Sequence, residues 1–159
     1  PAPIGDAGPG PSQILAIAIA PPVLPPERAL RMIGTIEREL FTPFGLRGAT
    51  GATRVETEWL GAFYSAHLRV HGRDPQSESR VRAWLEPLDR ILGPGASGIL
   101  PEAFELGAAA GAAPDGDLFA ADDEPRPAGD PVSVIAAAEI LRVWVEELHL
   151  APEPAEELR

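Results

Sequence analysis

The chain has 159 residues, 45% of them apolar, which is enough for one domain with a buried core. It contains no cysteine, so disulfides, thiol nucleophiles and cysteine-based metal sites are excluded. The net charge is −11 and all 13 basic residues are arginine, so we expect neither a nucleic-acid nor an anionic-membrane partner, since both need a positive patch.

The N-terminal part begins with residues 1–10, whose Pro, Gly and Ala content is typical of a disordered lead-in. An unbroken apolar run, residues 14–20, follows. Its Ile-Ala alternation favours a strand, whereas its alanines favour a helix with Ser12 as the N-cap, so the pattern leaves both open. The run is too short to cross a bilayer and follows no charged segment, so we expect a cytoplasmic protein with no signal peptide.

Two helices are predicted in the next part of the chain. Prolines force residues 21–26 to be extended. Apolar residues then recur every three or four positions, which predicts a helix over residues 27–40. A second helix is predicted over residues 56–71. It carries two apolar stripes, which is typical of a helix packed on both sides.

Two more helices are predicted towards the C-terminus. Asp74 and Pro75 are a typical cap and first residue for a helix that runs to about residue 92, and Pro87 is expected to kink it. The last helix covers residues 132–148. Its apolar stripe, which we expect to face the core, consists of Val134, Ala138, Leu141, Val145 and Leu148.

Between these helices, residues 107–128 are rich in Ala, Gly, Asp and Pro and are expected to form a flexible insert. Residues 150–159 are expected to be an acidic tail. No alternation of strands and helices is visible, so the sequence predicts an all-α domain over residues 11–149.

The exact amino-acid sequence of residues 11–47 gives information beyond this pattern of helices. They read PSQILAIAIAPPVLPPERALRMIGTIERELFTPFGLR and resemble the C-terminal region of bacterial glycogen-debranching enzymes, the amylo-α-1,6-glucosidase family. That family reads roughly RPNQ, an apolar run, LLPPERA and LLTPxGLR at this point. Weaker similarity extends to residue 148, and includes residues 99–104, ILPEAF, where the family reads SISEIFDG.

The resemblance implies an (α/α)6 toroid of the six-hairpin glycosidase type, with about five helices present here as a partial toroid. It makes residues 14–20 a helix. The implied partners are an α-glucan or oligosaccharide, and the missing N-terminal part of the toroid or a second chain, because an incomplete ring leaves apolar helix faces open. It implies no cofactor.

Glycoside hydrolysis needs two carboxylates, one to protonate the leaving oxygen and one to activate water. The resemblance makes Glu102 the candidate general base, with the acid expected upstream of this chain. It also points to Gln13, Arg47 and Trp59 as candidate substrate-binding side chains.

Two other groups of residues are read as structural. His67 and His71 have the i, i+4 spacing that can bind a metal, but no Glu or Cys lies near them in sequence, so we expect no metal site. Trp59, Trp84 and Trp144 lie on or beside helix stripes, so core packing is favoured over sugar stacking.

Several substrate-contact motifs of the family are absent. Where the family has HQGTVW, residues 52–57 read ATRVET, and where it has QAWS, residues 133–136 read SVIA. The loss of these polar contacts predicts weak or no hydrolysis by this chain alone. Three hypotheses follow. The first is the C-terminal part of a glycogen-debranching-type α-1,6-glucosidase acting on α-glucan. The second is a non-catalytic helical scaffold or interaction domain derived from that family, and the third is a degraded, pseudogene-like remnant.

Overall fold

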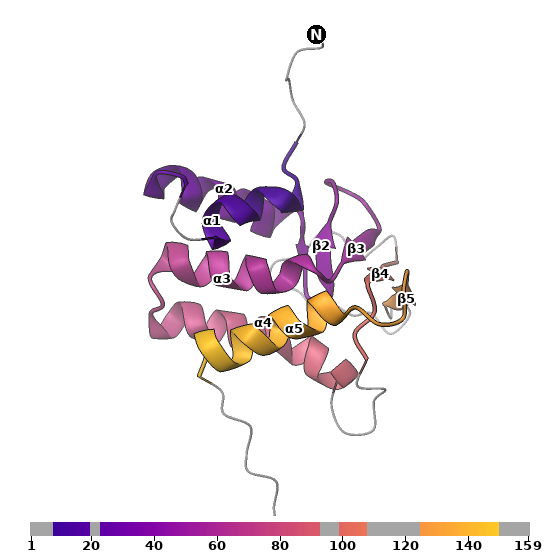
Figure 1. Ribbon diagram of the computed structural model, residues 1–159. Coiled ribbons are helices and arrows are strands. Elements are labelled where there is room, and N and C mark those ends of the chain that lie inside the picture. Colours follow the sequence, from indigo (N-terminus) through magenta and orange to yellow (C-terminus); the bar gives the residue numbers. More distant parts are fainter. Residues whose placement is uncertain (1–7, 20–22, 93–98, 108–124, 150–159) are drawn as a thin grey trace, which may run out of the picture.

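The computed structural model describes residues 8–19, 23–92, 99–107 and 125–149 (Figure 1). A 3-10 turn, Pro11–Ile14, leads into the first helix, and a π-helical turn, Val143–Glu147, continues the last one. The α-helices are α1 (Leu15–Ala18), α2 (Pro26–Glu39), α3 (Trp59–His71), α4 (Pro75–Leu92) and α5 (Val134–Arg142).

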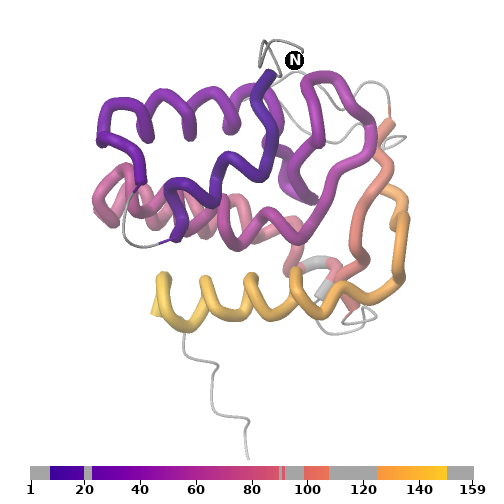
Figure 2. The backbone as a smooth tube through the Cα atoms, turned by 45° about the horizontal axis from the view of Figure 1, so that its top comes forward, coloured from indigo at the N-terminus to yellow at the C-terminus, as the bar shows by residue number. Residues whose placement is uncertain are grey.

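The helices lie in two layers around α3. Helices α1, α3 and α5 lie side by side in one row, and α2 and α4 lie behind it (Figures 1 and 2). Helix α3 packs against all four of the others, whereas α1 and α5 stand at the two ends of the row. The core therefore lies along α3.

Helices α2 and α4 form where the sequence predicts them, and α3 ends at His71 as predicted but starts at Trp59 rather than at residue 56, because Arg54–Glu56 forms a strand. Pro26 is the first residue of α2, which buries Ala29, Ile33 and Ile36. Gly72 ends α3 in the left-handed conformation, with φ 85°, that glycine adopts most readily. Asp74 caps α4, because its Oδ1 accepts a hydrogen bond from the Ser77 backbone N–H at 2.7 Å.

A five-stranded antiparallel sheet lies at one end of the helices (Figure 1). Its order is β1-β2-β3-β4-β5, with strands Phe41–Thr42, Gly45–Arg47, Arg54–Glu56, Ala103–Glu105 and Arg126–Ala128. Cross-strand pairs run Leu46↔Glu56↔Ala103↔Ala128 and Arg47↔Val55↔Phe104↔Pro127. In chain order, α2 leads into strand β1, α3 follows strand β3, and α5 follows strand β5.

The expected all-α fold, and with it the partial (α/α)6 toroid, is therefore wrong. Each strand has only two or three residues, so no alternating pattern is long enough to signal it in the sequence. The pairs also join segments that lie far apart, as in Arg54↔Glu105. The sheet makes this a mixed helix-and-sheet domain.

The orientation of α5 also differs from the expectation. Ala136, Ile140 and Val143 face the core, while Val134, Leu141 and Val145 of the predicted core stripe are exposed, and Leu148 is buried beyond the π-helical turn. Both sides of α5 are apolar, so periodicity could not tell which side packs against α3.

The N-terminal run forms a helix only in part. The 3-10 turn and α1 end at Ala18, and the backbone of Ile19 is extended. Gly10 rather than Ser12 precedes the first turn, and no side chain caps it.

The insert predicted over residues 107–128 lies largely outside the described residues, as do residues 1–7 and 150–159. At its C-terminal end, Arg126–Ala128 forms β5. Helix α4 is continuous through Pro87.

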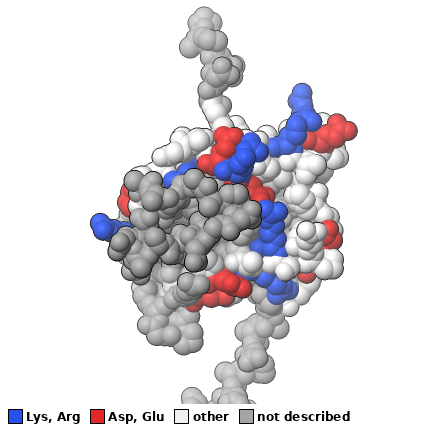
Figure 3. Space-filling view, turned by 180° about the vertical axis from the view of Figure 1, so that it is seen from behind, with Lys and Arg blue, Asp and Glu red and all other residues white. Residues whose placement is uncertain are grey.

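On the face opposite to that of Figure 1, arginine side chains lie next to acidic ones in small mixed groups (Figure 3). In the part of the chain that the structure describes, none of the helices combines the length and apolarity that crossing a membrane requires. The cytoplasmic location stays a prediction.

Candidate functional site

The backbone around Glu102 is fixed at the sheet. The Glu102 N–H donates to the Asp130 carbonyl at 2.9 Å. Its carbonyl accepts from the Thr57 N–H at 3.0 Å and from the Thr57 hydroxyl at 2.9 Å. These bonds hold Glu102 between β3, β4 and the turn that precedes α5.

The Glu102 carboxylate is half exposed and already has partners. Its Oε2 accepts from the Asp130 N–H at 3.0 Å, and its Oε1 lies 4.0 Å from the Arg54 guanidinium. The same guanidinium lies 4.0 Å from Glu105. A Cβ at Gly129 would lie 2.5 Å from Glu102 Oε2, so the turn approaches this carboxylate closely. The Glu102 carboxylate thus links the turn at Asp130 to Arg54 of β3.

The three candidate substrate-binding residues lie in different environments. Arg47 is buried in β2, where its guanidinium donates to the Ala52 carbonyl and burial lowers its pKa. Trp59 is half-buried at the start of α3 and donates from Nε1 to Glu56 at 2.7 Å. Gln13 is exposed on the N-terminal 3-10 turn.

The sheet therefore brings Arg47, Trp59 and Glu102 into neighbouring strands and their ends, whereas Gln13 belongs to a separate element. Arg47 and Trp59 are both engaged within the fold. Arg47 holds the turn after β2, and Trp59 bonds to the strand before its own helix.

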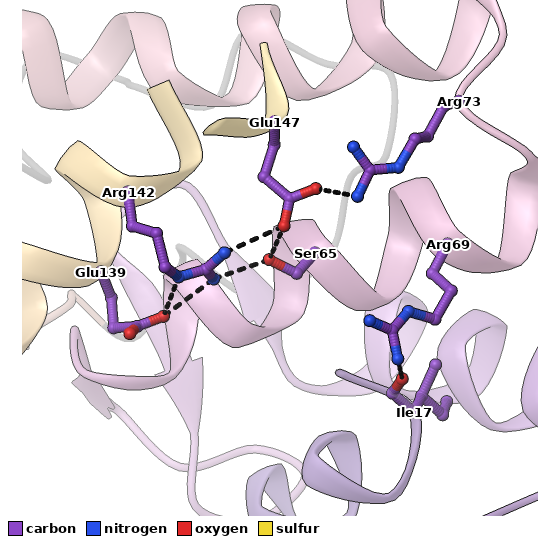
Figure 4. A network of polar contacts seen from close by, with 7 residues as sticks. All are labelled: Ile17, Ser65, Arg69, Arg73, Glu139, Arg142 and Glu147. Atoms are coloured by element: carbon purple, nitrogen blue, oxygen red, sulfur yellow. Dashed lines mark hydrogen bonds and ion pairs between the residues drawn. The ribbon is translucent and has the colours of Figure 1, made fainter. Parts of the chain in front are cut away.

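A polar network between α3 and α5 was not predicted (Figure 4). The Ser65 hydroxyl donates to Glu147 at 2.8 Å, and Arg142 donates to Ser65 at 2.7 Å and to Glu147 at 2.9 Å. Arg142 also bonds to Glu139 at 2.9 Å, and Arg73 pairs with the other oxygen of Glu147. This network, Ser65, Arg73, Glu139, Arg142 and Glu147, fixes α5 against α3.

The π-helical turn supplies Glu147, the buried one of the two acidic residues in that network. The Leu148 N–H donates to the Val143 carbonyl at 3.0 Å, and Glu147 and Leu148 are both buried. Burial alone would raise the pKa of Glu147, but the hydrogen bonds from Ser65 and Arg142 and the charges of Arg73 and Arg142 lower it overall. The carboxylate is therefore held in its charged form.

A second cluster joins α2, α3 and α4. Buried His67 Nδ1 lies 3.6 Å from Glu37, which also pairs with Arg80. The ring of His67 lies 4.4 Å from that of His71 and 4.8 Å from that of Trp84. No glutamate lies close to the two histidines in sequence, but the fold places Glu37 of α2 beside His67.

The electrostatics of this cluster fit a structural role. Burial alone would raise the pKa of Glu37, but His67 and Arg80 lower it overall. Burial and neighbouring His67 lower the pKa of His71. The described residues hold no group of three side chains suited to a metal ion.

The outer face of α5 carries several exposed apolar side chains. Val134 is 74% exposed and Leu141 58%, and Ile135 and Val145 are also exposed. At 100° per residue, Val134, Ala138, Leu141 and Val145 fall on one stripe, opposite the buried residues Ala136, Ile140 and Val143. We call this stripe the α5 face.

The other end of the row has a matching feature. Ile14 and Ile17 are buried, whereas Leu15 and Ile19, four positions apart, are exposed, Ile19 by 57%. We call Leu15 and Ile19 the α1 edge. Helix α5 and the segment from α1 to the extended Ile19 thus both expose apolar side chains that α3 does not cover.

No family model, no curated protein and no solved structure matches this chain.

Proposed function

We propose that this chain is a non-catalytic interaction domain that binds an apolar helix through the α5 face. The observation that carries the proposal is the exposed stripe Val134, Ala138, Leu141 and Val145 on a helix that is apolar on both sides. A helix that is apolar all round is buried in its working state. Grouped exposed apolar side chains mark interaction surfaces, whereas scattered ones do not.

The polar network supports this role because it fixes which side of α5 points outward. Arg142 and Glu147 bind Ser65 on the inner side, so α5 cannot rotate to bury its outer stripe without breaking buried charged hydrogen bonds. The network therefore keeps the apolar stripe of α5 exposed to solvent, where a partner can bind it.

The chemistry of the partner follows from shape and charge. The stripe follows the length of one helix, so it fits a second helix packed along it. The net charge of −11 repels an acidic partner, so we expect the partner helix to be apolar with an uncharged or basic rim.

The glycoside-hydrolase hypothesis rests on the sequence resemblance alone. Hydrolysis requires two carboxylates free to exchange protons with sugar and water. Glu102 instead accepts a backbone N–H and lies beside Arg54. We expect no glucose release from an α-1,6-branched limit dextrin, for the wild-type chain and for Glu102→Gln alike. Turnover that Glu102→Gln abolishes would overturn the non-catalytic role.

Binding itself is tested with two synthetic Leu/Ala helical peptides, one with an arginine rim and one with a glutamate rim. We expect fluorescence anisotropy to show tighter binding of the arginine-rimmed peptide. Leu141→Asp should weaken it at least tenfold, which corresponds to about 1.4 kcal/mol.

A matched control is Leu30→Asp, since Leu30 is 50% exposed on α2, away from the α5 face. This variant should bind both peptides as the wild type does. Absence of binding up to about 1 mM peptide, or equal weakening by both variants, rules out the α5 face as the binding surface.

A further inference from the structure

We propose that the α5 face is covered by the α1 edge of a second copy of this chain, in a head-to-tail contact. This inference rests on the proposed function and names its partner. Its starting point is the pair of open edges at opposite ends of the row α1, α3, α5 (Figure 2). Leu15 and Ile19 form one edge, and the stripe around Leu141 forms the other.

The arrangement inside the domain shows how such a contact is made. Helix α3 packs against α1 on one side and α5 on the other. Helices α3 and α5 both start near the sheet and run away from it, and α1 runs in the same direction as they do (Figure 1). The α1 edge of a second copy beside α5 would add a fourth helix to this row in the same direction.

The charge distribution favours this occupant. Residues 7–26, which include the α1 edge, contain no charged side chain. The α5 stripe consists of Val, Ala and Leu. Neither set of contacting side chains therefore carries a charge, and the repulsion between the charges elsewhere on two copies acts over distances that salt screens.

A repeated interface of this kind buries both the α5 face and the α1 edge of every copy, except in the copies at the two ends of an open assembly. A contact between two different surfaces is heterologous, so it repeats until the ring closes or continues as a filament. An α5-to-α5 contact would instead be isologous and would leave the α1 edge open in every copy. These two modes differ in which single substitutions they tolerate.

The test uses Leu141→Asp and Ile19→Asp, which place a charge in the α5 face and in the α1 edge respectively. Sedimentation of the full chain should show self-association of the wild type that tightens from about 0.05 to 0.5 M NaCl. Each variant alone should be monomeric. An equimolar mixture should form a 1:1 heterodimer and nothing larger, because one intact α5 face remains to meet one intact α1 edge.

Circular dichroism checks that both variants keep the wild-type fold, and Leu30→Asp should assemble as the wild type does. Three results would overturn the inference: a monomeric wild type, an Ile19→Asp variant that still self-associates, or a mixture that stays monomeric. A monomeric wild type that still binds the arginine-rimmed peptide overturns the second copy as partner and leaves the proposed function standing. Failure of both experiments removes both.

Discussion

Helices α3 and α5 both leave the sheet and are both apolar around most of their circumference, yet only α3 is covered on both sides. Leu60, Phe63 and Leu68 of α3 are fully buried, whereas Val134 and Leu141 of α5 face solvent. The two helices differ in their place in the row. An apolar helix surface is normally buried against another surface. In α3 the neighbouring helices of the same chain bury it, whereas α5 has no such neighbour among the described residues on its outer side.

The comparison is tested most strongly by truncating one apolar side chain on each helix. Phe63→Ala should lower the free energy of unfolding by about 3–5 kcal/mol, because it leaves a cavity among packed aromatic rings. Leu141→Ala should change it by no more than about 0.5 kcal/mol, since this side chain lies in water. Urea unfolding of the monomeric chain measures both. Similar losses would mean that α5 is covered in the monomer.

The next largest effect concerns the polar network that holds α5. Glu147→Ala should cost about 2–3 kcal/mol, because the Ser65 hydroxyl and Arg142 lose their acceptor next to α3, while solvent partly compensates the exposed Arg73. Its neighbour Glu146 is exposed, so Glu146→Ala is the matched control and should be near neutral. Thermal unfolding of both variants checks the difference, and equal melting temperatures would show that the network does not hold α5.

A smaller effect is expected where α3 and α5 approach most closely. A Cβ at Gly61 would lie 2.5 Å from the Cβ of Glu139, so Gly61→Ala should push the helices apart at a cost of about 1–3 kcal/mol. Gly34 of α2 has no atom within 4 Å of the same position. Gly34→Ala should therefore stabilise the domain by up to about 1 kcal/mol. A gain from both substitutions would contradict the close packing of α5.

The smallest effect is the acid dependence of the same contact. The pKa of Glu147 is lower in the folded chain than its ordinary value of 4.5, so its contribution is complete above pH 4.5. That contribution is lost as the pH falls through the lower, folded value. Glu147→Gln should be less stable at pH 7, and its stability should fall less steeply below pH 4.5. Parallel curves of unfolding free energy against pH would exclude this role for Glu147.

The sequence predicts the helices well because each carries a local signal. Pro26, Gly72 and Asp74 mark helix ends by their own backbone preferences, and α2 begins, α3 ends and α4 begins within one residue of the predicted positions. The two-sided packing predicted for residues 56–71 is confirmed by α3. These features depend on residues within a few positions of one another.

The sheet and the candidate site depend on distant residues, which is why prediction fails there. Nothing near Arg54 in the sequence indicates that it pairs with Glu105. The sequence of α5 offers two apolar sides, and only the position of Ser65 on α3 explains why Arg142 and Glu147 turn inward. Glu37, the neighbour of His67, comes from another helix.

The short sheet also has a consequence for the order of folding. Its pairings β1–β2 and β2–β3 close short loops, whereas Arg54↔Glu105 closes a loop of 50 residues, which costs more chain entropy and forms more slowly. Helices α2, α3 and α4 follow one another closely, so they can assemble before β4 and β5 join. Helix α5 should then dock last, and its amides should exchange with solvent before those of α3.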